Sequence, residues 1–182
     1  MHPTLTEHLL DLVQNAMDAG ATFVEVSVAE EEGTITVTVS DNGRGMTKAE
    51  RQKALDPFQS GGRKHPARRV GLGLPFFLQM VEQVGGHFDL RSEPGVGTSI
   101  LASYRADHPD APPVGEWPEG VVQAMALSDQ AEMVFRRTRG DRVFTIRRSE
   151  LAEALGGLAD AEALDLARRY VRERHEEFLG KG

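Results

Sequence analysis

The sequence predicts an α+β fold, a two-layer sandwich in which helices cover one face of a mostly antiparallel sheet, with a small C-terminal α+β appendage. Two observations carry this prediction. In residues 1–105 the apolar patterns read helix, strand, strand, helix, helix, strand, strand. Strands that follow one another directly favour antiparallel pairing, and helices placed between such pairs must share one face of the sheet.

The first predicted element is an amphipathic helix over residues 4–19, with Gly20 placed to end it. Its apolar residues follow the helical spacing and are expected to face a core: Leu5, Leu9, Leu12, Val13 and Ala16. Two alternating segments come next, "TFVEVSVA" and "TITVTVS", joined by the acidic "EEEG". Such a pattern predicts a β-hairpin, with valines at every second position facing the core.

A short helix over residues 48–55 follows the hairpin. Residues 56–73, "DPFQSGGRKHPARRVGLG", contain glycine, proline and basic residues without an apolar period, which predicts a loop. A second core-facing helix is then marked by Leu74, Phe77, Leu78 and Val81. The strands "HFDLRS" and "TSILASYR", joined by "EPGVG", complete the first unit.

The chain is expected to divide into a domain of residues 1–105, a proline-rich linker of residues 106–119 and an appendage of residues 120–182. In the linker, Trp117 is interpreted as an anchor onto the domain. The appendage is predicted to contain a helix near residues 120–127, a hairpin that turns at Gly140 and two further helices. It shows no residue pattern that indicates chemistry.

Composition excludes several classes of function. The chain has 21 Lys and Arg against 28 Asp and Glu, a net charge of -7, which argues against nucleic acid as a partner. It has no cysteine, so disulfides, thiolate metal sites and a cysteine nucleophile are excluded. No apolar run approaches 18 residues and no secretory signal opens the chain, so we expect no membrane partner and a cytoplasmic location.

Three glycine-bearing segments fall at the ends of predicted elements: "DNGRGM", "GLGL" and "PGVGT". One such segment alone is usually turn chemistry. Three of them, preceded by a helix that carries Asn15 in its interior between Asp11 and Asp18, indicate a ligand. The phosphate-loop pattern is absent, and the dinucleotide fingerprint fails at Phe76. "GLGL" with Pro75 instead predicts a helix start whose backbone amides attract phosphate.

In order and spacing, "EHLLDLVQNAMDAGAT", "DNGRGM", "DPF", "GLGL" and "EPGVGTSI" resemble the boxes of the GHKL ATPases. That superfamily contains gyrase-type topoisomerases, heat-shock-protein-90 chaperones, histidine kinases and mismatch-repair MutL proteins. The resemblance covers residues 5–104 and implies a Bergerat-type ATP-binding fold. The chain as a whole is similar to stand-alone bacterial ATP-binding proteins of histidine-kinase-like type.

The resemblance implies ATP and Mg²⁺ as cofactors and assigns roles to three polar residues. Asn15 matches the residue that coordinates the Mg²⁺ bridging the ATP phosphates, through an amide oxygen that adds no charge. Asp11, one turn earlier on the same helix face, matches a glutamate that orients or deprotonates the attacking water. Aspartate is one methylene shorter, which reduces its reach as a catalytic base. Asp41 matches the carboxylate that accepts a hydrogen bond from the adenine amino group.

The other implied site residues lie near the glycine segments. Gly43 and Gly45 keep the backbone clear of the base, and Met46 lines the adenine pocket. Thr98 supports hydrogen bonding on the adenine side, and Phe58 matches an aromatic that packs beneath a lid. The residues implied to wrap the phosphates are Gly71, Leu72, Gly73 and Leu74.

Simpler interpretations compete with some of these roles. Asp11 and Asp18 also fit the solvated side of an amphipathic helix, which is favoured for Asp18. Arg63, Lys64, Arg68 and Arg69 are either solvated charges or contacts for a triphosphate. His8 lies near the face of Asp11, but a structural imidazole is favoured over a phosphoacceptor, because family acceptors belong to a separate upstream helix.

Three functions stay open. The first is an ATP-dependent kinase that phosphorylates a partner protein in trans, in the manner of the anti-sigma-factor serine kinases that the "DPF" and "GLGL" segments resemble. The second is an ATP-gated binding module with slow or no turnover, in which the nucleotide changes how the appendage meets a partner. The third is an ATPase subunit in which Asp11 positions water. A protein partner is expected in each case, and a homodimer is left open.

Overall fold

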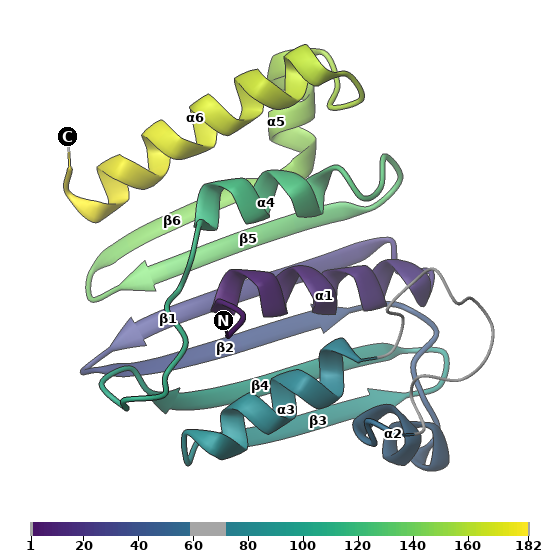
Figure 1. Cartoon of the computed structure of the whole chain (residues 1–182). Coiled ribbons are helices and arrows are strands. Elements are labelled where there is room, and N and C mark those ends of the chain that lie inside the picture. Colours follow the sequence, from purple (N-terminus) through teal and green to yellow (C-terminus); the bar gives the residue numbers. More distant parts are fainter. Residues whose placement is uncertain (1, 59–71, 182) are drawn as a thin grey trace.

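The computed structural model describes residues 2–58 and 72–181, and every structural statement below concerns these residues. They form six helices and six strands (Figure 1). In chain order the elements are α1 (Leu5–Asp18), β1 (Phe23–Glu31), β2 (Thr34–Asp41), α2 (Lys48–Leu55), α3 (Gly73–Gln83), β3 (His87–Glu93), β4 (Gly97–Arg105), α4 (Trp117–Met125), β5 (Glu132–Arg139), β6 (Arg142–Arg147), α5 (Arg148–Leu155) and α6 (Ala161–Leu179).

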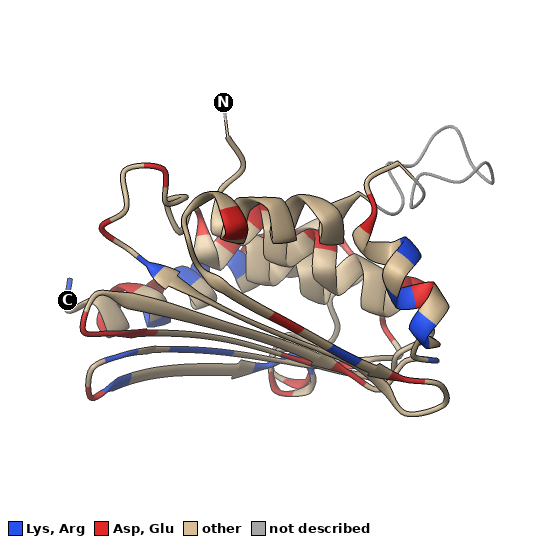
Figure 2. Ribbon diagram, turned by 90° about the horizontal axis from the view of Figure 1, so that it is seen from below, with Lys and Arg blue, Asp and Glu red and all other residues tan. Residues whose placement is uncertain are grey.

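All of the described strands belong to one sheet with the order β3-β4-β2-β1-β5-β6. Neighbouring strands are antiparallel except β1 and β5, which pair in parallel. Seen along the sheet in Figure 2, α1 and α3 form a layer over one face. The predicted α+β two-layer sandwich is therefore confirmed.

The predicted core of α1 is buried throughout, because its apolar residues share the face that meets the sheet. The helix starts at a capping box: the Thr4 hydroxyl accepts from the Glu7 backbone N–H at 3.2 Å, and the Glu7 carboxylate accepts from the Thr4 N–H at 2.7 Å. The alternating residues of β1 and β2 are buried opposite it. They are Val24, Val26, Val28, Ile35, Val37 and Val39.

The C-terminal segment, residues 120–182, extends the same sheet. Strand β5 lies beside β1, with Val26 opposite Phe135, and α4 packs against α1. The helix begins at Trp117, earlier than the predicted residue 120, because Pro118 is tolerated in a first helical turn. Trp117 is 2% exposed and packs edge-on against Phe135. The predicted division into separate domains stays a prediction.

The linker is attached to the start of α1. The Leu5 and Thr6 backbone N–H groups donate to the Pro113 and Val114 carbonyls at 2.9 Å each. These two N–H groups are among those that a helix start leaves unsatisfied. The linker thus fixes the position of the helix that carries Asn15.

No helix among the described residues is both long enough and apolar enough to cross a membrane.

Candidate functional site

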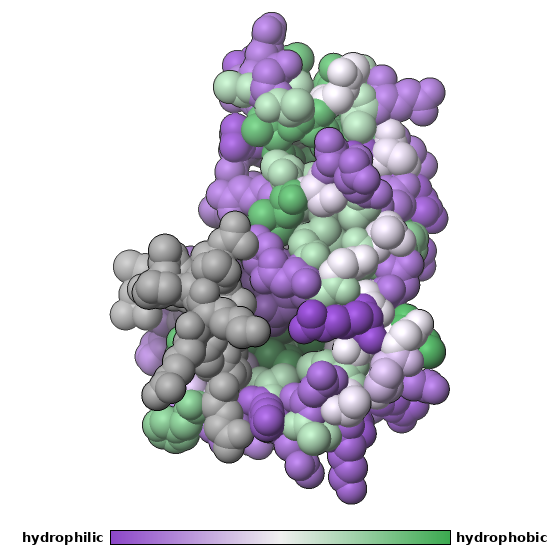
Figure 3. Space-filling model, turned by 90° about the vertical axis from the view of Figure 1, so that its right-hand side faces the viewer, coloured by the Kyte–Doolittle hydropathy of each residue, from purple (hydrophilic) through white to green (hydrophobic). Residues whose placement is uncertain are grey.

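A pocket of about 340 Å³ lies between α1, α2 and the inner face of the sheet, where β2 ends and β4 begins. Its volume falls within the range of small-molecule sites. Figure 3 shows the side of the molecule on which it opens, with apolar side chains in a hollow between hydrophilic ones. Six predicted site residues line it: Asn15, Asp41, Gly45, Met46, Leu74 and Thr98.

Asp41 is the central polar group of the pocket. It ends β2 opposite Thr98 of β4. Its Oδ1 accepts from the Gly43 backbone N–H at 2.8 Å, and the Thr98 backbone also donates to the carboxylate. Burial raises the pKa of Asp41 above its ordinary value, although both of these hydrogen bonds act to lower it. A half-buried carboxylate with acceptor capacity left can bind a ligand N–H.

Neighbouring atoms lie too close to positions 43 and 45, which follow Asp41, for any residue other than glycine. Gly45 has φ 69°, and a Cβ there would lie 1.9 Å from the Glu93 carbonyl oxygen. A Cβ on Gly43 would lie 2.9 Å from Asp41 Oδ1. We predicted that these glycines leave room for a base; the structure adds that they leave room for the chain's own neighbouring groups.

On α1, Asn15 and Asp18 both line the pocket, one turn apart. Asp18 was favoured as a solvated charge; its side chain is exposed, and it also lies among the residues that line the pocket. It accepts a hydrogen bond from the Gln14 amide at 3.1 Å. Asp11 is exposed and lies outside the lining. It sits against the start of α3, where a Cβ on Gly73 would be 2.8 Å from the Asp11 Cβ.

The predicted phosphate-binding segment is described in part. Gly73 and Leu74 form the first turn of α3, and no side-chain hydrogen bond caps the helix at Leu72. Backbone amides of a first helical turn are the groups that bind phosphate at a helix start. Gly71 and the four basic loop residues lie outside the described residues. Phe58 is 95% exposed, and the structure does not bring it to the pocket.

Sequence reasoning missed four residues around the site. Arg44, Glu50 and Lys53 line the pocket, and Ser92 accepts from the Met46 backbone N–H at 2.8 Å. For Ser92 a signal existed, because the alternation of "HFDLRS" places it on the same strand face as the apolar Phe88 and Leu90. For Arg44 and the α2 residues no local pattern indicates the pocket.

His8 is a structural residue. It is 4% exposed and its ring packs against Phe77 at a centroid distance of 5.7 Å. Burial lowers the pKa of His8, so the neutral imidazole is favoured. The burial supports the favoured interpretation over that of a phosphoacceptor.

A divalent cation could be held here only in part by the protein. Among the described residues, no group of three or more His, Cys, Asp or Glu side chains is arranged to bind a metal ion. Mg²⁺ commonly takes one or two protein ligands and completes its shell with water and substrate phosphates. Asn15, in the pocket wall, fits that mode of binding.

Comparisons with known proteins point in the same direction. Residues 2–108 match the family model described as histidine kinase-, DNA gyrase B-, and HSP90-like ATPase. Virulence sensor protein BvgS of Bordetella bronchiseptica is 32% identical over 106 residues, which cover 57% of this chain and 9% of BvgS. Sensor histidine kinase ZraS of Klebsiella oxytoca is 38% identical over 96 residues, which cover 51% of this chain and 20% of ZraS.

A solved structure of the catalytic domain of histidine kinase ThkA is also similar, with a TM-score of 0.42 and 21% identity over 54% of this chain and 64% of that one. The chain spans a fifth or less of the length of BvgS and of ZraS. Since the family model matches more than half of the chain, the chain belongs to the histidine kinase-, DNA gyrase B- and HSP90-like ATPase family.

Proposed function

We propose that the pocket binds ATP with Mg²⁺ and that the chain transfers the γ-phosphate to a partner protein in trans. The observation that carries the proposal is the Asp41 end of the pocket, where a half-buried carboxylate faces a cavity also lined by Met46 and Thr98. A carboxylate in that setting accepts a hydrogen bond from an exocyclic amino group. The apolar lining beside it suits the faces of a purine.

The phosphates would extend from the base toward α1 and the start of α3. Asn15 would hold Mg²⁺, which neutralises phosphate charge and aligns the transferred group. The backbone amides at the start of α3 would contact phosphate oxygens. Lys53, on the α2 side of the pocket, supplies a positive charge for the same anion. The protein's contribution to transfer is therefore positioning and charge stabilisation.

Nucleotide binding is tested by titrating the full chain with Mg-ATP. Asp41→Asn keeps the size of the side chain but presents an amide that can turn its N–H₂ toward the ligand. We expect its Kd to rise roughly 10- to 100-fold, since hydrogen bonds to charged groups are worth about 1.5–3 kcal/mol. Asp89→Asn, on the edge strand β3 and paired with Arg91, is the matched control. Equal affinity of Asp41→Asn and wild type would remove the placement of the base.

Phosphoryl transfer is tested separately with γ-labelled ATP and candidate partner proteins. Label on a partner, lost in Asn15→Ala, is the expected result, because Mg²⁺ would then lack its protein ligand. Nucleotide binding without label on any protein would reject the transfer step while leaving the pocket assignment standing.

A second candidate, the ATP-gated binding module, is favoured by one observation. The linker carbonyls of Pro113 and Val114 bind the start of α1, and the same helix carries Asn15. A change at the nucleotide would therefore act on the attachment of the C-terminal segment. Nucleotide-dependent protection of residues 113–125 from hydrogen exchange, without phosphate release, would support this function.

The third candidate, an ATPase, is tested with Asp11→Asn. If Asp11 positions water, phosphate release falls at least tenfold while Mg-ATP affinity stays within about twofold. Because Asp11 lies outside the pocket lining, we do not expect Asp11→Asn to lower phosphate release while leaving Mg-ATP affinity unchanged.

A further inference from the structure

Three polar residues form a row across adjacent strands at the base end of the pocket. Asp41 of β2 lies opposite Thr98 of β4, and Thr98 lies opposite Ser92 of β3. Directly opposite residues in neighbouring strands point to the same face of a sheet. Asp41 and Thr98 line the pocket, whereas Ser92 lies behind Thr98 and does not.

The Ser92 hydroxyl has three partners. It accepts from the Met46 backbone N–H at 2.8 Å, lies 3.1 Å from the Gly97 carbonyl oxygen and lies 2.8 Å from the Thr98 hydroxyl. A hydroxyl has one proton to donate and two lone pairs. Gly97 offers only an acceptor, so Ser92 donates there, and Thr98 must then donate its proton to Ser92. This is the arrangement that satisfies all three contacts.

The consequence for the pocket is a wall that only accepts hydrogen bonds. With its proton held by Ser92, the Thr98 hydroxyl presents lone pairs alone. The Asp41 carboxylate beside it also accepts, with the Gly43 N–H already bound to Oδ1. Two neighbouring acceptors match a group with two N–H bonds and repel a carbonyl oxygen. We propose that Ser92 is a positioning residue that makes the site select a 6-amino purine over a 6-oxo purine.

This inference rests on the proposed nucleotide binding and adds the residue that sets base selectivity. Without the Ser92 hydroxyl, the Thr98 hydroxyl is free to rotate. It can then donate to a 6-oxo oxygen, so the repulsion of that oxygen weakens while binding of the amino group loses an ordered acceptor. Ser92 also holds Met46, but that contact acts on both purines alike and leaves their ratio unchanged.

The test compares ADP with inosine diphosphate, which carries an oxygen at the position of the amino group. The measured quantity is the Kd for inosine diphosphate divided by the Kd for ADP, both determined with Mg²⁺ for the full chain. We expect wild type to favour ADP and Ser92→Ala to lower the ratio roughly fivefold to tenfold, the value of one neutral hydrogen bond. Ser92→Thr, which keeps the hydroxyl, retains the ratio. Ser99→Ala, which removes a hydroxyl bonded to Ser40, is the matched control.

Thr98→Val provides a second route to the same result. If Ser92 acts through the Thr98 proton, the Thr98→Val ratio falls by a similar factor and the double variant falls no further, because both changes remove one interaction. Independent, multiplying effects would overturn the inference, as would a Ser92→Ala ratio equal to that of wild type. Failure of wild type to bind ADP at all would instead overturn the proposed function.

Discussion

The two halves of the sheet each carry a charged side chain on the helix-covered face, and the surroundings of the two charges differ. Asp41 of β2 faces a cavity and keeps acceptor capacity. Arg137 of β5 is 7% exposed, and its Nη1 donates to His175 Nε2 at 2.7 Å. Its guanidinium lies 5.9 Å from the Trp117 ring and 5.6 Å from the Phe178 ring.

Asp41 is placed to bind a ligand, whereas Arg137 is placed to pack within the protein. The Trp117 and Phe178 rings and His175 cover much of the Arg137 guanidinium, which leaves little of it accessible to a ligand. Cation-π contacts of this kind stabilise a desolvated guanidinium. Burial alone therefore does not identify a functional site, whereas burial beside an open pocket does. The three predictions below test this contrast, from the largest expected effect to the smallest.

The largest effect is expected from removing the C-terminal segment with its linker. A chain of residues 1–105 loses β5 from the edge of β1, the linker bonds to α1 and the cover of α4. We expect it to lose cooperative thermal unfolding at temperatures where the full chain is folded, because several fully buried side chains become exposed. Circular dichroism melting measures this. A stable, ATP-binding truncated chain would support the predicted boundary near residue 105.

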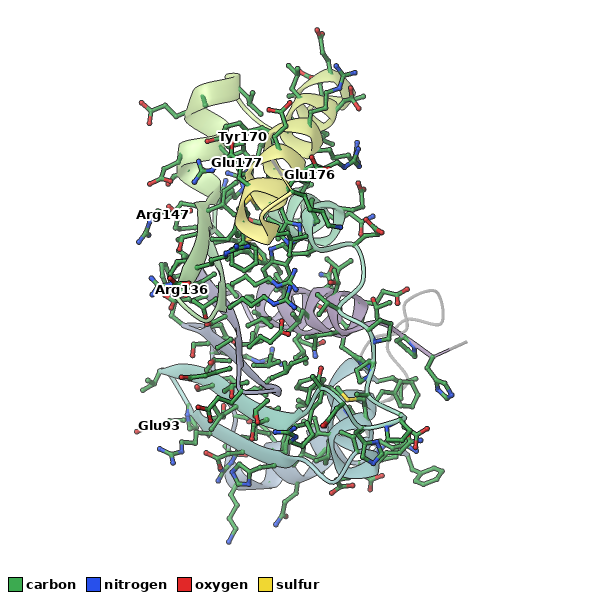
Figure 4. All side chains as sticks on the ribbon, turned by 90° about the vertical axis from the view of Figure 1, so that its left-hand side faces the viewer. Glu93, Arg136, Arg147, Tyr170, Glu176 and Glu177 are labelled. Carbon is green, nitrogen blue, oxygen red and sulfur yellow. The ribbon has the colours of Figure 1, made fainter. Side chains whose placement is uncertain are left out.

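A smaller effect is expected at Arg137 itself. Arg137→Ala should destabilise the fold by about 3 kcal/mol through the lost packing and the cavity left behind, while the Kd for Mg-ATP stays within about twofold. Arg136→Ala is the matched control, since Figure 4 shows Arg136 and Arg147 directed away from the helix layer. Denaturant unfolding and nucleotide titration measure the two quantities. A large loss of Mg-ATP affinity in Arg137→Ala would contradict the interpretation that Arg137 serves packing alone.

Arg137→Met sharpens the same prediction. Methionine fills much of the space among the rings without burying a charge, so its cost should be clearly smaller than that of alanine. If methionine proves as costly as alanine, the charge and not the packing determines the stability.

Much of the fold could be predicted from the sequence because the spacing of apolar residues along each segment indicates its secondary structure. The apolar faces of α1, β1 and β2 repeat at helical and strand spacing, and the bounds of α2 match the predicted residues 48–55. The parallel pairing of β5 with β1 was not predicted, since it joins segments about a hundred residues apart and no short pattern encodes it. The first turn of α4 was assigned to the linker because of Pro118.

The candidate site was predictable to the same extent. Asn15 and Asp41 belong to the sequence segments that resemble the ATPase boxes, and both line the pocket. Lys53 and Ser92 reach the site through the docking of α2 and through strand register, which are tertiary properties. Asp18 is exposed, as a solvated charge would be, but its place in the lining could not be predicted, because a charge at the end of a helix has the same sequence pattern whether or not a pocket lies beside it.

The smallest effect is expected from pH, and it arises at His175. This ring is 8% exposed; burial, with the charges of Arg137 and Lys181, lowers its pKa to about 4 from an ordinary value of 6.5. Between these values the unfolded chain binds the proton and the folded chain does not. The free energy of unfolding therefore falls as pH is lowered from about 6.5 to about 4.

His175→Gln removes the titrating ring and keeps a side-chain acceptor for Arg137. We expect the variant's stability to depend less steeply on pH than that of wild type in this window, measured as the difference between two denaturant-unfolding series. His8 keeps its own contribution of the same sign in both proteins, because burial lowers its pKa as well, so it cancels from the difference. Parallel curves would mean that His175 protonates equally in the folded and unfolded chains, and Arg137 would then lack the neutral acceptor that its enclosed position requires.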